Sequence, residues 1–452
     1  MKANKKPEKG QEWGEVSVEL QRRLVNFLGV FLRELDERID QRLVRTLVLT
    51  IGALIELRHP GCGLLLSELG GYILTPAQAP AGTKRLSNLL RSPKWHYGLI
   101  ERFLWGQGDA RIAALQAQGA EALVVWDESV LEKAESRTLE GLCAVRSSVA
   151  RQLKRIKPGF YNPPSKPLFV PGMNWAGLLV MGITGAPTVA AMRWWSTRGV
   201  GSSDKRTEEG KLLRQCGKRW GTQVLHIFDR GFAGTPWLRQ LLGFRLRFVL
   251  RWQKHYKLMD AQGQSRKAWE IGRGKRALAH RFIWDASRHC ERKIGLYYTQ
   301  VCHPDFPNTP LWLVISRQGQ GRSPWYLLTN QPVASVDHAF TLIRAYARRW
   351  QIEMAWRYTK SDLAFESPRL HRWEHRLKLL LIATLAYAFL LSLLDPLLND
   401  FRHRLLRHFC HRTGKRCRDA ATPLYRLRAA LAKLWTAHPR LPDPLPLLLI
   451  SG

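Results

Sequence analysis

The sequence predicts an α/β protein in which a core of strands and helices is interrupted by a β-rich unit and flanked by helical regions at both ends. Three observations predict this class. Apolar runs of strand length recur between residues 122 and 229 and alternate with polar stretches of helical length. Further strand-like runs follow at hairpin-like intervals in 246–330. Apolar residues at helical spacing dominate before and after these segments.

The chain has 452 residues, which is room for about three domains of ordinary size. We expect a helical region at 1–115, the α/β core at 116–252 and 331–370, the β-rich insertion at 253–330, and a helical, basic region at 371–452. No internal repeat divides the chain differently.

The N-terminal region is predicted to consist of amphipathic helices. Apolar residues in 20–35 recur at positions i, i+4, i+7 and i+8, and a second apolar run covers 43–57. We interpret "TPAQAPAG" as a flexible loop, after which Thr83 caps a short helix, "KRLSNLLRS". This helix carries Lys84 and Arg85, a basic face that either lies against nucleic acid or is simply solvated.

The core is predicted from four apolar runs. They are "ALVVWD", "WAGLLVMGIT", "TVAAMRWW" and "QVLHIFD", beginning at residues 122, 175, 188 and 223. A polar helix is expected at 204–219 and another from Thr235. The Pro- and Lys-rich segment 151–172 is too irregular for the interior of an element, and it either contacts the substrate or is only solvated.

The charge balance indicates a polyanionic partner. Lys and Arg number 71 against 36 Asp and Glu, a formal charge of +35, and the 45% hydrophobic content excludes a disordered basic tail. Nucleic acid is therefore the first partner to consider. Seven cysteines without paired spacing and a start without an apolar core predict the cytoplasm. The uncharged run 379–394 is shorter than the roughly 20 residues that span a bilayer, so we expect a core helix and no membrane contact.

Two aspartates are placed where a sheet presents ligands. Asp127 and Asp229 each end an apolar strand, and the strand ends of open α/β sheets are where ligands gather. An aspartate at such a position is more often a turn residue when it stands alone. Two of them from one sheet can converge on a common site.

A third carboxylate comes from "AYARRWQIEMAWRYTK", residues 345–360, which we expect to be one helix. At about 100° per residue, Tyr346, Arg349, Glu353 and Lys360 share an arc of roughly 60°. A salt-bridged helix face accounts for the Arg and the Glu. It gives no reason for the Tyr and the Lys. Three converging carboxylates can bind two hard divalent ions for phosphodiester chemistry, and the cations beside them can hold the phosphate.

With these residues in view, the chain resembles the insertion sequence 4 family of DDE transposases. Its signature is Tyr, two residues, Arg, three residues, Glu, six residues, Lys, and Tyr346, Arg349, Glu353 and Lys360 fill it. "LVVWDES" resembles the family's first-Asp strand, "IFDRGFAG" its second-Asp motif, and "WYLLTNQPV" the run upstream of the signature helix. The resemblance covers about residues 83–370.

The resemblance implies a ribonuclease-H-like core in which Asp127, Asp229 and Glu353 are catalytic and bind two Mg²⁺ or Mn²⁺ ions. It implies DNA as the partner, both the element's ends and its target, and a homodimer in the DNA complex. Trp325 resembles a tryptophan that stacks on a flipped base, although it could equally be a core residue on a strand. The residues that we expect to bind DNA are Tyr346, Arg349, Lys360, Trp325, Arg230, Lys84 and Arg85. The protein would act in the bacterial cytoplasm, at the nucleoid.

Two points stay open: which carboxylates bind the metal, and what function the protein has. The family often has Thr two residues after the first Asp, whereas this chain has Glu128 and Ser129. Glu128 is thus a rival ligand, although on a continuing strand its side chain points to the opposite face from Asp127. A non-catalytic DNA-binding protein and a site-specific nuclease without strand transfer are the competing functions.

Overall fold

The computed structural model describes residues 9–59, 61–136, 138–150, 166–199, 201–285, 290–319, 323–410 and 424–448. The helices are α1 (Lys9–Asp36), α2 (Gln41–Glu56), α3 (Leu66–Ile73), α4 (Ala79–Arg91), α5 (Gly98–Ala117), α7 (Lys205–Arg219), α8 (Thr235–Gly243), α9 (Ala268–Gly272), α10 (Val336–Ala347), α11 (Trp350–Ser361), α12 (Trp373–Ser392), α13 (Asn399–Phe409) and α14 (Leu424–Ala437). Short 3₁₀ turns include η1 (Pro76–Gln78), η3 (Arg230–Phe232) and η6 (Leu445–Leu448).

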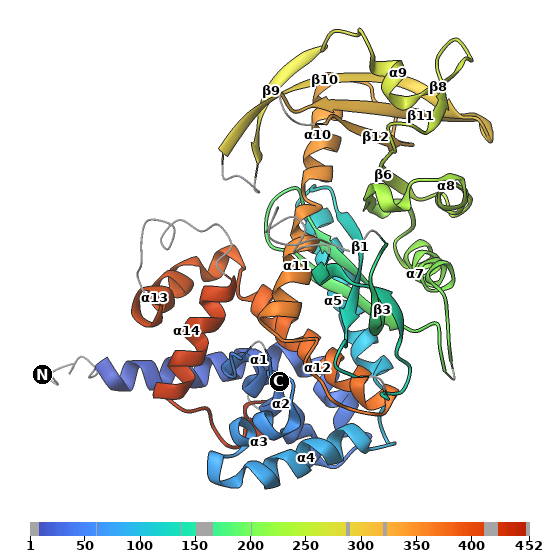
Figure 1. Cartoon of the computed structure of the whole chain (residues 1–452). Coiled ribbons are helices and arrows are strands. Elements are labelled where there is room, and N and C mark those ends of the chain that lie inside the picture. Colours follow the sequence, from blue (N-terminus) through green and yellow to red (C-terminus); the bar gives the residue numbers. More distant parts are fainter. Residues whose placement is uncertain are drawn as a thin grey trace, which may run out of the picture.

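The strands are β1 (Leu123–Glu132), β2 (Cys143–Arg146), β3 (Phe169–Met181), β4 (Thr188–Trp195), β5 (Leu225–Phe228), β6 (Arg247–Arg251), β7 (Lys257–Met259), β8 (Ser265–Lys267), β9 (Ala279–Asp285), β10 (Cys290–His303), β11 (Phe306–Arg317) and β12 (Trp325–Thr329). The mixed α/β fold that the sequence predicts is confirmed. Helices α1 to α4 lie at one end of the molecule and β9 to β11 at the other (Figure 1).

The sheet places the two candidate aspartates on neighbouring strands. Among the described residues, the order of its main path is β2-β3-β1-β5-β6-β12-β11-β10-β7-β8, with β4 paired to β3 and β9 to β10. Strand β1 is parallel to β5, and β5 is parallel to β6. Strand β3 is antiparallel to both β1 and β4. The carboxyl ends of β1, β4, β5 and β6 therefore meet at one edge of the sheet.

Strands β10 to β12 continue the core sheet and do not form a separate sheet. Strand β12 pairs with β6, with Leu328 opposite Leu250 and Thr329 opposite Val249. The Thr329 hydroxyl also donates a hydrogen bond to the Phe248 carbonyl at 2.6 Å. Strands β10 and β11 continue outward from β12. The strands within 253–330 are thus joined to the core by a backbone ladder.

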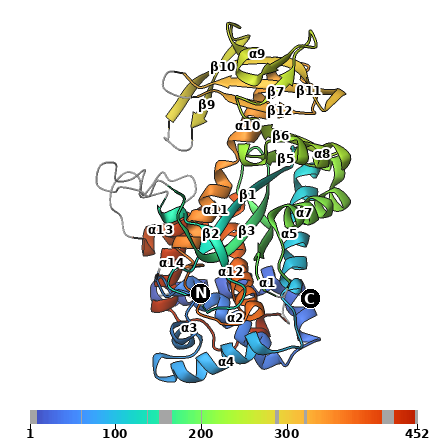
Figure 2. The same cartoon turned by 45° about the vertical axis from the view of Figure 1, so that its right-hand side comes forward.

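Helices cover both faces of the sheet, as Figure 2 shows from the side. Val124 and Trp126 point to the face covered by α5, α7 and α8, where they pack with Leu213 and Trp237. Val125 belongs to the other buried cluster, which is covered by α10, α11 and α12. This alternation along β1 decides which helix each neighbouring side chain meets.

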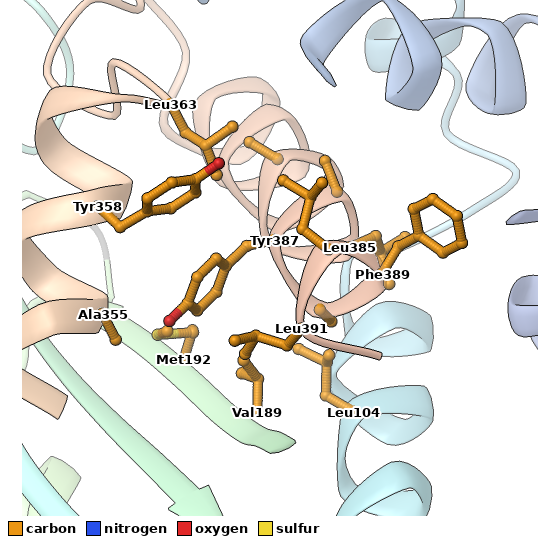
Figure 3. Packing of buried hydrophobic residues seen from close by; sticks show 14 of the residues in the cluster. Leu104, Val189, Met192, Ala355, Tyr358, Leu363, Leu385, Tyr387, Phe389 and Leu391 are labelled. Carbon is orange, nitrogen blue, oxygen red and sulfur yellow. The ribbon is translucent and has the colours of Figure 1, made fainter. Parts of the chain in front are cut away.

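Helix α12 fills the core behind α11. Figure 3 shows Tyr387 pointing toward Met192 of β4 and lying beside Tyr358 of α11. The two tyrosine rings are stacked, with centroids 5.5 Å apart. Helix α12 is long and apolar enough to cross a membrane, but 89% of its apolar window is buried inside the protein. The expectation of a core helix is confirmed.

The N-terminal helices pack against the C-terminal part of the chain. The Ser17 hydroxyl donates to the His438 carbonyl at 2.8 Å. The Gln21 side chain both donates to and accepts from the backbone of Leu441. Arg428 of α14 donates to the carbonyls of Leu54 and Leu57 at 2.7 and 2.6 Å, which satisfies the carbonyl end of α2.

Some expectations about individual elements are wrong. Thr83 does not cap α4, because the helix begins at Ala79 with Pro80 in its first turn, where a proline is tolerated. "TPAQAPAG" is consequently the start of a helix. Residues 168–172 were expected to be irregular, yet most of them belong to β3, which pairs with β2 there. The rest of the irregular segment, 151–165, lies outside the described residues.

Candidate catalytic site

Asp127 lies in the middle of β1, on the face covered by α11. Its Oδ1 accepts a hydrogen bond from the Glu128 amide at 2.9 Å, and its Oδ2 accepts one from the Trp356 indole at 3.1 Å. The Arg349 guanidinium is 3.8 Å from Oδ2. The side chain is only 20% exposed. The Asp127 carboxylate thus accepts from two neutral donors and lies close to one cation.

The surroundings of Asp127 disfavour the ionised form of its carboxyl group. Burial raises its pKa to about 7, although Arg349 and the Glu128 amide oppose the shift. The carboxylates of Asp229 and Glu353 act in the same direction as burial. Even with Arg349 nearby, burial thus favours the neutral form of Asp127 below neutral pH, and a further cation at the site would favour the ionised form.

Asp229 follows β5 directly and precedes η3. Its Oδ1 accepts a hydrogen bond from the Tyr346 hydroxyl at 3.2 Å. Burial, and then the charge of Asp229, raise the pKa of Tyr346 to about 12. Tyr346 thus keeps its proton and acts as a donor to Asp229.

Arg349 connects the first and third carboxylates. It forms an ion pair with Glu353 one turn later and also approaches Asp127. The sequence predicted one continuous helix here. The structure instead has two, because α10 ends at Ala347 and α11 begins at Trp350. At this junction the hydrogen bonds tighten to i, i+3, with Arg349 bonded to Tyr346 at 3.0 Å. The backbone stays right-handed, so Tyr346 and Glu353 still face the same site.

Lys360 lies near the other end of α11. Its ammonium is 3.9 Å from Glu366, and burial lowers its pKa while Glu366 opposes the change. Glu366 in turn accepts a hydrogen bond from the Glu132 amide at 3.2 Å, at the end of β1. Glu366 thus connects Lys360 with the end of β1.

The remaining predicted residues divide into two groups. Trp325 lies edge-on to Tyr346, with ring centroids 5.0 Å apart, and Arg230 is exposed directly after Asp229. These two residues border the carboxylates. Lys84 and Arg85 are exposed on α4, at the far end of the molecule (Figure 1). They do not belong to this cluster.

Glu128 is turned away from the cluster. Strand β1 continues through Glu132, so the side chains of Asp127 and Glu128 point to opposite faces. Glu128 meets α7, where it forms an ion pair of 2.6 Å with Lys205. Sequence reasoning missed this partner. It also missed Trp356, although Trp356 stands one helical turn after Glu353 on the same helix.

The donor chemistry of the cluster suits a hard divalent cation. Asp127, Asp229 and Glu353 offer only carboxylate oxygens, which Mg²⁺ and Mn²⁺ prefer. In the described part of the chain, no three His, Cys, Asp or Glu side chains lie close enough together to hold an ion as they stand. Arg349 lies between Asp127 and Glu353 and neutralises them instead. Glu353 would have to leave Arg349 in order to share an ion with Asp127.

Comparison with known proteins supports one class. Residues 196–389 match a family model described as the transposase DDE domain. The matched segment contains Asp229 and Glu353, whereas Asp127 lies before it. The match supports a DDE transposase. No curated protein matches the chain.

Among solved structures, the chain is similar to piggyBac transposase, seen by cryo-electron microscopy in a synaptic complex with hairpin DNA. The sequence identity is 13% and the TM-score is 0.38. The similarity covers 92% of this chain and 85% of that one.

Proposed function

We propose that the protein is the transposase of an insertion sequence, which binds the terminal inverted repeats, cleaves the DNA ends and joins the 3′ ends to target DNA. One observation carries the proposal: Asp127, Asp229 and Glu353, from two strands and a distant helix, approach one another around Arg349 and Tyr346. The match of residues 196–389 to a transposase DDE domain supports it independently.

The core is of the ribonuclease-H-like type in this proposal. The strand order β4-β3-β1-β5-β6, with β3 antiparallel to its neighbours, is the observation that supports it. This arrangement sets Asp127 and Asp229 on adjacent parallel strands. Helix α11 then delivers the third carboxylate from across the sheet face.

Asp127, Asp229 and Glu353 would hold two Mg²⁺ or Mn²⁺ ions. When bound, the ions supply an activated attacking oxygen and charge stabilisation for an in-line displacement at phosphorus. The protein's own side chains would orient the carboxylates and bind the phosphate. Tyr346 orients Asp229, the Trp356 indole orients Asp127, and Arg349 and Lys360 offer guanidinium and ammonium groups to the phosphate.

DNA would contact the chain at two separate places. Trp325 and Arg230 border the carboxylates and would hold the cleaved end, with the Trp325 ring stacked on a base. Lys84 and Arg85 on α4 would contact the inverted repeat further along the duplex. Two ends require two sites, so a homodimer is the expected form in the DNA complex. The chain would act in the cytoplasm at the bacterial nucleoid.

The test is cleavage of a duplex that carries the terminal repeat. Asp229→Asn should keep DNA binding and lose Mg²⁺-dependent nicking, because it removes the charge that holds the metal. Asp337→Asn on α10, which removes an exposed carboxylate paired with Arg281 of β9, is the matched control. Nicking by Asp229→Asn at the level of this control would rule out the site. Wild-type protein that cuts without joining the ends to a plasmid would be a nuclease. Protein that binds DNA and cuts nothing would be the non-catalytic alternative.

A further inference from the structure

The ladder between β1 and β5 stops before it reaches the two aspartates. Its last register pair is Val125 with Ile227, so Asp127 and Asp229 each lie two residues beyond the last paired position. Beyond it, β1 remains paired with β3, whereas the chain after Asp229 turns into η3. Backbone pairing of β1 with β5 therefore does not itself set the separation of the two carboxylates.

Lys205, the first residue of α7, lies across this gap. Its Nζ is 2.6 Å from Oε1 of Glu128, the residue after Asp127. The same ammonium is 5.6 Å from the ring centroid of Phe232, the third residue after Asp229. One ammonium group thus lies near a side chain from each of the segments just beyond the two aspartates.

Helix α7 holds Lys205 in this position. The Asp204 side chain caps the helix by accepting from the Thr207 amide at 3.1 Å. Glu209, one turn after Lys205, is 3.9 Å from its Nζ and only 3% exposed. Burial, and then the neighbouring Glu128, raise the pKa of Glu209. Glu128, whose Oε1 is 2.6 Å from the Lys205 ammonium against 3.9 Å for Glu209, is therefore the main partner of the Lys205 charge.

We propose that Lys205 is a positioning residue of the candidate site: by joining Glu128 to Phe232, it sets the separation of the Asp127 and Asp229 carboxylates. It acts from the face of the sheet opposite to Arg349. The proposal rests on the proposed function in one respect, that these aspartates are metal ligands. A half-exposed ion pair contributes little to folding. The effect of Lys205 is therefore expected in metal affinity.

The chain offers a matched control on the same helix. Lys211 forms an ion pair of 2.7 Å with Glu208, and its side chain is 54% exposed against 49% for Lys205. Glu208 has no catalytic neighbour in sequence. Lys205→Met keeps the hydrocarbon stem and removes the charge, Lys205→Arg keeps the charge, and Lys211→Met removes an equivalent charge elsewhere.

Mn²⁺ binding by calorimetry without DNA, and nicking as a function of Mn²⁺, test the proposal. Lys205→Met should weaken Mn²⁺ binding by about 10-fold or more, as is usual for residues that orient metal ligands. Its nicking should recover at saturating Mn²⁺. Lys205→Arg should restore most of the affinity, and Lys211→Met should bind Mn²⁺ like the wild type. Melting temperatures should be alike.

The proposal is overturned if Lys205→Met binds Mn²⁺ as well as Lys211→Met does, or if Lys205→Arg binds as weakly as Lys205→Met. If Lys205→Met does not fold, Glu128→Gln removes the other half of the ion pair, and unchanged Mn²⁺ affinity in that variant is the overturning result. Wild-type protein that binds Mn²⁺ but never cuts DNA contradicts the proposed function alone. Wild-type protein that binds no Mn²⁺ overturns both.

Discussion

At the scale of single residues, the carboxylates of the site are held in conflicting environments. Asp127 is mostly buried beside two other carboxylates, and Arg349 compensates it only from 3.8 Å. Asp229 lies directly after its strand and has the Tyr346 hydroxyl as its donor. A protein that needed only stability would not bring such groups together. The conflict is what a binding site for a cation requires.

Asp127→Asn should stabilise the metal-free protein at alkaline pH. The folded pKa of Asp127, about 7, lies above its ordinary unfolded value of about 3.9. The folded chain therefore keeps a proton that the unfolded chain loses as pH rises from about 4 to about 7, and stability falls across this window. Asn cannot ionise, so the variant avoids the loss. Chemical denaturation in a chelator should show a gain of a few kcal/mol at pH 8 and none near pH 4. Equal stability at pH 8 would mean that Asp127 ionises without penalty.

Tyr346→Phe should impair the site without loosening the fold. The substitution removes the hydroxyl that donates to Asp229 at 3.2 Å and keeps the ring that packs against Trp325. If Asp229 is the metal ligand that we propose, nicking at limiting metal should fall about 10-fold or more, since Asp229 loses its orienting partner. Tyr425→Phe on α14, an exposed tyrosine remote from the site, serves as the control. A Tyr346→Phe variant as active as Tyr425→Phe would assign the hydroxyl no role.

Spacing along the chain predicted part of the site. The intervals among Tyr346, Arg349 and Glu353 place them on one helical face, and the tightened turn between α10 and α11 leaves this face intact. The roles of Trp356 and Lys205 could not be predicted from spacing. Each depends on which helix packs on which face of β1, and a single sequence does not state that.

At the scale of elements, α3 and α4 cross at unusually close range. A Cβ on Gly70 would lie 2.5 Å from the Ala79 carbonyl oxygen and 2.6 Å from the Thr83 amide nitrogen. Only a glycine allows this approach. The crossing fixes how α4 presents its basic face, with Lys84 and Arg85 pointing outward.

Gly70→Ala should therefore separate the two helices. Overpacking of this kind typically costs about 1 to 3 kcal/mol. Gly71→Ala is the control, because a Cβ there would meet its nearest neighbour at 3.7 Å, an ordinary contact. Thermal unfolding should show a lower melting temperature for the first variant and an unchanged or higher one for the second. Equal melting temperatures would mean that the crossing relaxes freely.

Element type was more predictable than element ends. Strand β4 and helix α7 were predicted almost to the residue, since Asp204 is a strong cap and the apolar run of β4 is continuous. The start of α4 was misplaced, because "TPAQAPAG" combines residues that favour loops. Tertiary packing against α3 and the tolerance for Pro80 in the first turn outweighed that preference. The short strand β2 has no periodic pattern that could reveal it.

At the scale of the whole molecule, the charge of +35 should govern DNA binding. The logarithm of affinity should fall with the logarithm of salt concentration, by about 0.9 for each phosphate that is neutralised. Replacing Lys84 and Arg85 by Ala should lower that slope by roughly 0.9 per lost contact. The control pair is Arg22 and Arg23 on α1, which are both bound to Glu19. Filter binding at several salt concentrations measures the slopes. Identical slopes for the two double variants would mean that α4 does not contact DNA.

The contacts between the two ends of the chain have a consequence for its synthesis on the ribosome. Helix α1 is bound to His438 and Leu441, and the carbonyls that end α2 are bound by Arg428. A nascent chain lacks these partners until residues 428–441 have emerged, although domains generally fold as units from the N-terminus. The helices that carry the basic face of α4 would thus be completed late. A chain released early by a stop codon before residue 424 would not present a finished surface to DNA.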